Sequence, residues 1–123
     1  MPLGGFMIAA WIEEIKKKTD PEKLGMIIAH NGIVRGTSQD GKTVMAMKLS
    51  YDKEKLDACV NNLKGREGVA DIRVWINEGM LNVGDDIMRL LVAGRFRTDV
   101  LPVLQELLTS IKNHIVHEEE IYS

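Results

Sequence analysis

A phosphate-binding pattern lies between two apolar segments of the chain. Residues 36 to 43 read Gly-Thr-Ser-Gln-Asp-Gly-Lys-Thr, which matches the G-x-x-x-x-G-K-[ST] loop that binds nucleotide phosphates. Such a loop needs a helix directly after it, because the amides and the positive end of that helix hold the anion. Here an alternating strand pattern follows from Val44, and Asp40 would place a negative charge beside the phosphates. The sequence therefore favours an exposed hairpin loop over a nucleotide site.

Two further groups of residues could in principle do chemistry. His114 and His117 are three residues apart and would share a helix face, with Glu118 and Glu120 close by. Two histidines without a preorganised third ligand make a poor metal site, and a charged chain end is expected to fray. Cys59 lies on the apolar stripe of a predicted helix and is interpreted as a core residue. We therefore predict no metal site, no cofactor and no catalytic thiol.

Composition narrows the class of protein. The chain has 123 residues, 45% of them hydrophobic, which is the size of one ordinary domain, predicted to span residues 1–123. The 16 Lys and Arg residues nearly balance the 18 Asp and Glu residues, which excludes a polybasic nucleic-acid-binding module. The single cysteine excludes a disulfide framework, and no apolar stretch is long enough for a signal peptide or a membrane span. We expect a soluble, cytoplasmic protein that binds neither nucleic acid nor membranes.

Hydrophobic periodicity predicts the elements that would position these residues. Helices are predicted at residues 7–18, from Asp52 to Gly65, and from a cap at Thr98 or Asp99 along the stripe Leu101, Leu104, Leu108 and Ile111. Strands are predicted at residues 25–34, 45–51, 70–76 and 87–93, with the first two paired as a hairpin and a turn between Gly79 and Gly84. This order predicts an α+β two-layer sandwich, in which an antiparallel sheet packs against helices on one face.

Four segments together resemble the large, catalytic subunit of molybdopterin synthase. Gly32-Ile33-Val34-Arg35 is similar to that family's G-x-V-R at the end of its first sheet strand. Residues 79 to 85 are similar to its G-x-L-x-x-G-[DE] turn between two strands. Arg97 matches the arginine of a His-Arg pair that opens the last long helix, and Lys112 follows it by fifteen residues, at the position of the family's first active-site lysine. The resemblance covers residues 25 to 112.

The resemblance implies an enzyme of molybdenum cofactor biosynthesis, built as a homodimer with a small ubiquitin-like sulfur-carrier subunit at each end. The carrier's C-terminal glycine thiocarboxylate would give its sulfur to cyclic pyranopterin monophosphate, making molybdopterin. By this analogy Arg35 and Arg97 would bind anionic groups of the substrates in two-point fashion. Lys112 would act at the reacting centre, by stabilising a developing anion or moving a proton. These three side chains are expected to converge on one concave site.

The sequence also departs from the family pattern. Ile76-Asn77 replaces the family's first His-Arg pair, and Phe96 replaces the histidine of the second. Residues 116 to 120 read Val-His-Glu-Glu-Glu in place of a Pro-x-Trp-Lys-x-Glu signature that carries a second active-site lysine. Carboxylates close to a phosphorylated substrate would repel it by about 1 kcal/mol per close pair in water. The alternative prediction is therefore a catalytically degenerate relative that binds a carrier tail or a pterin phosphate without turnover.

Overall fold

The structure, a computed structural model, describes the backbone of residues 4–123 and the side chains from residue 7 onward, so the first three residues of the predicted domain lie outside it. Its elements are α1 (Gly4–Lys18), the 3₁₀ turn η1 (Pro21–Lys23), β1 (Met26–Ile33), β2 (Val44–Tyr51), α2 (Lys53–Lys64), β3 (Val69–Ile76), β4 (Gly79–Asn82), β5 (Asp86–Gly94), α3 (Arg97–Ser110), the π-helical turn η2 (Ile111–Ile115) and β6 (Val116–Tyr122). The predicted α+β class is confirmed. None of the helices in residues 4–123 is long and apolar enough to cross a membrane.

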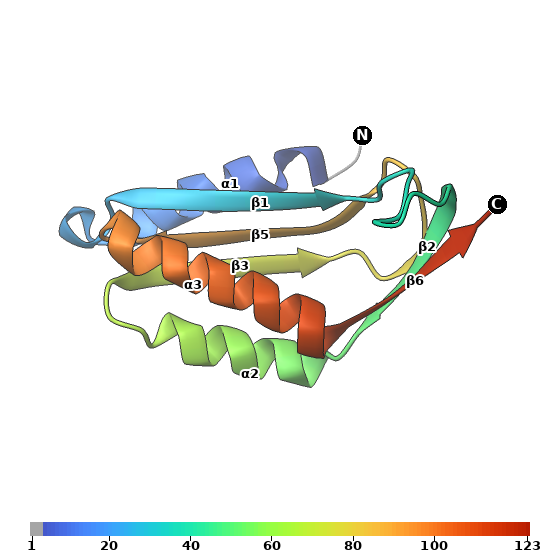
Figure 1. Cartoon of the computed structure of the whole chain (residues 1–123). Helices are drawn as coiled ribbons and strands as arrows, with labels where there is room; N and C mark the ends of the chain where they lie inside the picture. Colours follow the sequence, from blue (N-terminus) through green and yellow to red (C-terminus); the bar gives the residue numbers. More distant parts are fainter. Residues whose placement is uncertain (1–3) are drawn as a thin grey trace.

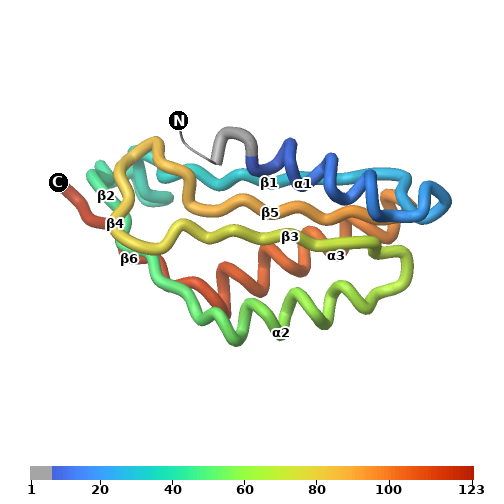
Figure 2. The backbone as a smooth tube through the Cα atoms, turned by 180° about the vertical axis from the view of Figure 1, so that it is seen from behind, coloured from blue at the N-terminus to red at the C-terminus, as the bar shows by residue number. Residues whose placement is uncertain are grey.

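The main sheet has the order β1-β5-β3, with both outer strands antiparallel to β5. Leu90 and Val92 face the core under α2 and α3, whereas Leu91 and Ala93 pack with Ile15 of α1 on the opposite face. Figures 1 and 2 show these two layers of helices from opposite sides. The prediction of helices on one face therefore holds for α2 and α3 and is wrong for α1. The physical reason is that β5 is apolar on both faces, so both faces must be covered.

A second sheet, of order β4-β2-β6, lies at one end of the molecule (Figure 1). The predicted hairpin is wrong, because β1 pairs with β5 while β2 pairs with β4 and β6. Only an isolated bridge between Thr37 and Thr43 closes the loop that joins β1 to β2. The C-terminal region does not fray, since residues 116 to 122 form an ordered strand along β2. Two strands, β4 and β6, were thus missing from the prediction.

The predicted N-terminal cap is confirmed for α2 and is wrong for α3. Asp52 caps α2 as predicted, accepting a hydrogen bond from the amide of Lys55 at 3.1 Å. The predicted cap of α3 is wrong: Phe96 is the cap residue, and the Asp99 carboxylate instead accepts from Arg95 Nε at 3.3 Å. The buried side of α3 is also rotated from the predicted stripe, with Leu101 38% exposed. The buried residues of α3 are Val100, Val103, Leu104 and Leu107.

Candidate functional site

Arg35 and Lys112 line one cavity, of about 650 Å³, although 77 positions separate them in sequence (112 − 35). The cavity lies between the end of β1, the loop that follows it, the turn after α3 and strand β6. Its lining residues are Ile33, Arg35, Thr37, Ser38, Gln39, Asp40, Met47, Ile87, Lys112, Glu118 and Glu120. The volume is in the range of sites for small organic ligands. Two of the three predicted site residues are therefore brought together.

A backbone clamp from a distant turn positions Arg35. The amide of Val34 donates to the carbonyl of Asp85 at 2.9 Å, and the amide of Gly84 donates to the carbonyl of Val34 at 2.9 Å. Gly84 has a φ of +93°, a conformation that favours glycine, and the Asp85 carboxylate accepts from the amide of Asn82 at 2.8 Å. The Gly-rich turn noted in the sequence thus fixes the residue directly before Arg35. Arg35 Nε also donates to the carbonyl of Thr37 at 2.6 Å.

Lys112 lies in η2, the wide turn that joins α3 to β6. Ile111 and Ile115 anchor this turn in the core, with exposed fractions of 0% and 6%. Lys112 itself is exposed, and it forms no ion pair within 4.0 Å with any residue that the structure describes. Irregular helical turns of this kind occur often at functional sites. The ammonium group is therefore free to meet a ligand in the cavity.

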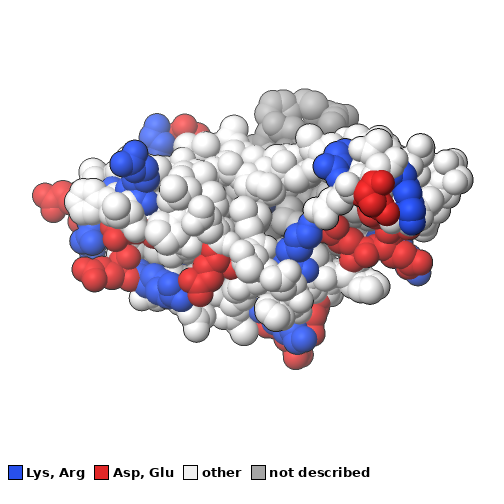
Figure 3. Space-filling view, viewed as in Figure 1, with Lys and Arg blue, Asp and Glu red and all other residues white. Residues whose placement is uncertain are grey.

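Acidic side chains share the cavity with these two cations. Glu118 and Glu120 come from β6, and Asp40 comes from the loop after β1. A hydrogen bond from the Ser38 hydroxyl is the main cause that lowers the pKa of Asp40 below its ordinary value. Across about 4 Å, each carboxylate would repel a bound anion by about 1 kcal/mol in water and by several times that where water is partly excluded. The cavity is thus mixed in charge. On the face that Figure 3 displays, positive and negative side chains are likewise intermingled at both ends of the molecule.

Sequence reasoning did not assign Glu118 and Glu120 to the site. The sequence related them to the substrate only as a departure from the family pattern, on a chain end expected to fray, whereas they alternate along a strand and face the cavity. The sequence carries no periodic signal for this arrangement, because residues 118 to 120 are all glutamate. In the strand, Val116, Glu118 and Glu120 are half-buried, and His117 and Glu119 are exposed. Among the described residues, no three His, Cys, Asp or Glu side chains group as metal ligands.

Arg97 lies away from this cavity. It is the first residue of α3, whereas Lys112 follows the last turn of that helix. Fifteen residues of helix correspond to roughly 20 Å at about 1.5 Å per residue. Figure 1 shows the two ends of α3 at opposite ends of the main sheet. Within one chain, Arg97 therefore does not converge with Arg35 and Lys112, contrary to the expectation from the sequence.

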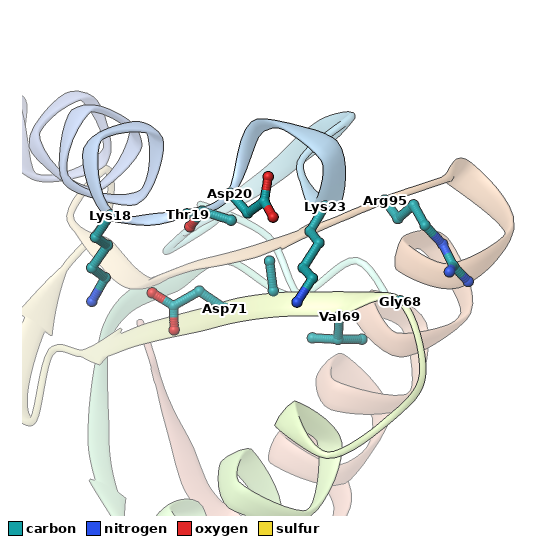
Figure 4. Close-up of a pocket in the computed structure, with 9 residues that line it drawn as sticks. Lys18, Thr19, Asp20, Lys23, Gly68, Val69, Asp71 and Arg95 are labelled. Carbon is teal, nitrogen blue, oxygen red and sulfur yellow. The ribbon is translucent and has the colours of Figure 1, made fainter.

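A second cavity, of about 520 Å³, lies at the Arg97 end of the molecule (Figure 4). Lys18, Lys23 and Arg95 line it together with Asp71. Arg95 is already paired, since its guanidinium lies 3.3 Å from the Asp99 carboxylate, and Figure 4 shows its side chain directed away from Asp71. Asp71 is itself held by two cationic side chains. Both charges are thus engaged by side chains that do not line the cavity, whereas Lys18 and Lys23 form no ion pair within 4.0 Å with any described residue.

The phosphate-loop pattern has the surroundings of an ordinary loop. Residues 36 to 43 lead into strand β2 and not into a helix, as predicted. The Ser38 hydroxyl accepts from the amide of Lys42 at 3.0 Å, and Lys42 Nζ lies 3.7 Å from the Asp40 carboxylate. The side chains of Ser38 and Lys42 are thus engaged within the loop. The prediction against a nucleotide site at this position agrees with the strand that follows it.

Solved structures of molybdopterin synthase components share this fold. Molybdopterin synthase from Staphylococcus aureus superposes with a TM-score of 0.73 and 15% identity, over 91% of this chain and 84% of that one. A complex of subunits 1 and 2 of molybdopterin-converting factor from Helicobacter pylori contains a chain with a TM-score of 0.74 and 16% identity, over 98% of this chain and 84% of that one.

Sequence comparison identifies the family as well as the fold. An uncharacterised protein of Methanocaldococcus jannaschii is 30% identical over 118 residues, which cover 88% of this chain and 99% of that protein. The model of the MoaE protein family matches residues 7–114, a span that includes Arg35, Arg97 and Lys112. The chain therefore belongs to the MoaE family, the large-subunit family associated with molybdopterin synthase in molybdenum cofactor biosynthesis.

Proposed function

We propose that this chain is the large subunit of a molybdopterin synthase. It takes sulfur from the C-terminal thiocarboxylate of a small ubiquitin-like carrier and transfers it to cyclic pyranopterin monophosphate. The observation that carries the proposal is that Arg35 and Lys112, distant in sequence, line one cavity of about 650 Å³. Arg35 offers a planar fork of donors for a phosphate or carboxylate, and Lys112 is positioned to stabilise a developing anion or move a proton.

The partners of the proposed reaction are a small carrier subunit and a second copy of this chain. The related Helicobacter pylori protein was solved as a complex of two subunits of molybdopterin-converting factor, which supports a small-subunit partner here. A homodimer would also give Arg97 a role, because Arg97 is remote from the cavity of its own chain. We propose that Arg97 binds an anionic group of the substrates at a cavity completed by the partner copy.

A second candidate function is binding without turnover, and one observation favours it. Glu118 and Glu120 line the cavity at the place where the family pattern continues to a second lysine. Carboxylates in that position lower the affinity for anions and supply no ammonium group. In this candidate the chain binds a carrier tail or a pterin phosphate, and no sulfur is transferred.

One reconstitution separates these candidates. The purified chain is mixed with a thiocarboxylated small subunit and cyclic pyranopterin monophosphate, and molybdopterin is measured. Carrier binding is measured in parallel by calorimetry. The matched variants are Lys112→Ala and the exposed control Lys16→Ala in α1.

Product that depends on Lys112 and not on Lys16 supports the enzyme. Carrier or pterin binding without product supports the second candidate. Neither product nor binding would remove both.

A further inference from the structure

Strand alternation presents Glu118 and Glu120 to the cavity and turns Glu119 away from it. Along β6, Glu118 pairs with Leu49 and Glu120 with Met47, two buried residues on the inner face of the second sheet. Glu119 pairs with the exposed Lys48 on the outer face. Because successive side chains of a strand point to opposite faces, the two carboxylates belong to the cavity wall and Glu119 does not. The chain thus contains its own control residue.

The two cavity carboxylates are not used within the chain as ion-pair partners. Neither lies within 4.0 Å of a cationic group of any described residue, and Glu120 accepts one hydrogen bond, from the Tyr122 hydroxyl at 3.1 Å. Both side chains are half-buried. Partly desolvated carboxylates favour hydrogen-bond donors, and a ligand that fills the cavity has to supply them in place of water. A ligand that is only an anion would not supply them.

We propose that Glu118 and Glu120 bind the N–H edge of the substrate's pterin ring, while Arg35 and Lys112 hold its phosphate. This inference rests on the proposed function, because it takes the pterin phosphate as substrate. The ring N3–H and the 2-amino group of a pterin carry three N–H donors, so one carboxylate can accept the two parallel donors and the other can accept the remaining amino N–H. Glu118 and Glu120 are thus specificity residues, and not residues of the sulfur-transfer step.

The cavity has the other features that such a ligand requires. Ile33, Ile87 and Met47 also line the cavity and supply apolar surface for a flat ring. The fused ring places the phosphate and the 2-amino edge at opposite ends of the molecule, so anion and carboxylates need not approach. A substrate with an acidic end and a donor-rich end suits a site that contains both cations and carboxylates.

The experiment compares two ligands on four proteins. The ligands are 6-hydroxymethylpterin monophosphate and its 2-oxo analogue, which lacks the 2-amino donor, and binding is followed by calorimetry. The proteins are the unaltered chain, Glu118→Gln, Glu120→Gln and the control Glu119→Gln. We expect the unaltered chain and the control to prefer the 2-amino ligand by about tenfold or more, as for a hydrogen bond to a charged group. We expect each cavity variant to reduce that preference to about threefold or less, because glutamine keeps one acceptor and adds a donor.

Binding of inorganic phosphate is a second measurement, in which the cavity variants are not expected to lose affinity. Removing a carboxylate charge beside Arg35 and Lys112 should leave phosphate affinity equal or raise it by about twofold to fivefold. General damage to the cavity would instead weaken both ligands. Circular dichroism and the thermal midpoint of each single variant establish that it is folded, so the comparison holds if either one folds.

The possible failures can be told apart. Equal binding of the two pterins by the unaltered chain, or a preference kept by both cavity variants, would overturn this inference and leave the proposed sulfur transfer intact. Absence of molybdopterin in the reconstitution, with no binding of the pterin phosphate, would instead overturn the proposed function. A preference lost in Glu119→Gln as well would show that overall charge, and not the cavity wall, decides.

Discussion

Asp71 and Glu118 are both carboxylates on strands, but the molecule treats them differently. Asp71 accepts from the amide of Ile72 at 2.8 Å and lies 2.9 Å from Arg73 Nε and 3.2 Å from Lys64 Nζ. Arg73 in turn reaches Glu14 of α1 at 2.6 Å, so this network ties α1 to β3. Glu118 lines the cavity without an ion pair to any described residue. Paired charges here stabilise the fold, and unpaired charges in a cavity are available to a ligand.

The surroundings of Asp71 are reflected in its titration. Burial alone would raise the pKa of Asp71, but the hydrogen bonds from Arg73 and Ile72 and the nearby Lys64 ammonium outweigh it, and the pKa is lowered. A carboxyl whose pKa is lowered by folding stabilises the native state above its unfolded pKa, and this stabilisation is lost as pH falls through the folded pKa. The contrast between the two regions leads to four predictions.

The largest effect is expected for Lys112→Ala. Loss of a positioned ammonium group should lower the rate of molybdopterin formation by about 100-fold or more. The free energy of unfolding should change by no more than about 0.5 kcal/mol, because the side chain is exposed and forms no ion pair with a described residue. Rate and urea unfolding are measured on the same preparation. If Lys112→Ala instead unfolded the protein enough to explain the lower rate, Lys112 would be a residue that stabilises the fold and not one that acts in the reaction.

Asp71→Asn should show the opposite behaviour. It removes a carboxylate that accepts charged hydrogen bonds and should lower the free energy of unfolding by about 1–3 kcal/mol at pH 7. Urea unfolding at pH 7 and at successively lower acidic pH measures the difference, which should shrink as the pH falls through the lowered pKa of the native Asp71 carboxyl. The turnover of the folded protein should be unchanged. A difference that persists at low pH would contradict the assignment of this stability to the carboxylate charge.

Arg97→Ala tests whether Arg97 of one copy of the chain acts at the cavity of a second copy. If Arg97 serves the partner's cavity, its removal should lower turnover by about tenfold, as expected for one charged hydrogen bond. Mixing Arg97→Ala chains with Lys112→Ala chains should restore roughly a quarter of the unaltered rate, because half of randomly mixed dimers carry one intact site. No recovery on mixing would refute a role for Arg97 in the partner's cavity.

The smallest effect is expected for Lys53→Ala. Lys53 Nζ lies 3.2 Å from the Asp57 carboxylate one turn along α2, but their side chains are 75% and 59% exposed. Such a pair is screened by water, so its loss should change the free energy of unfolding by about 0.5 kcal/mol or less. Thermal unfolding in low and high salt would test this, because salt screens an exposed ion pair and should remove the small contribution that it makes. A decrease in the free energy of unfolding as large as that of Asp71→Asn would contradict the view that only buried ion pairs stabilise this fold.

Part of the site could be predicted from the sequence, and part could not. Local signals placed Arg35 at the end of a strand and Lys112 at the end of a helix, and both line the cavity. The predicted turn between Gly79 and Gly84 is partly right, because residues 79–82 form β4 and the turn itself follows Asn82. Its role in clamping Val34 depends on a contact about 50 positions away in sequence (84 − 34). The strand that presents Glu118 and Glu120 to the cavity was missed, because a segment of acidic residues has no apolar period of its own.

The sequence by itself determined the local structures: the N-cap at Asp52, the helices, and the strand β5 that is apolar on both faces. These follow from side-chain periods and capping groups within one segment. Only the tertiary structure decided that β1 pairs with β5, that β6 pairs with β2, and that Arg35 and Lys112 line one cavity. Strand pairing depends on which distant surface a segment can cover, and no pattern within the segment specifies its partner.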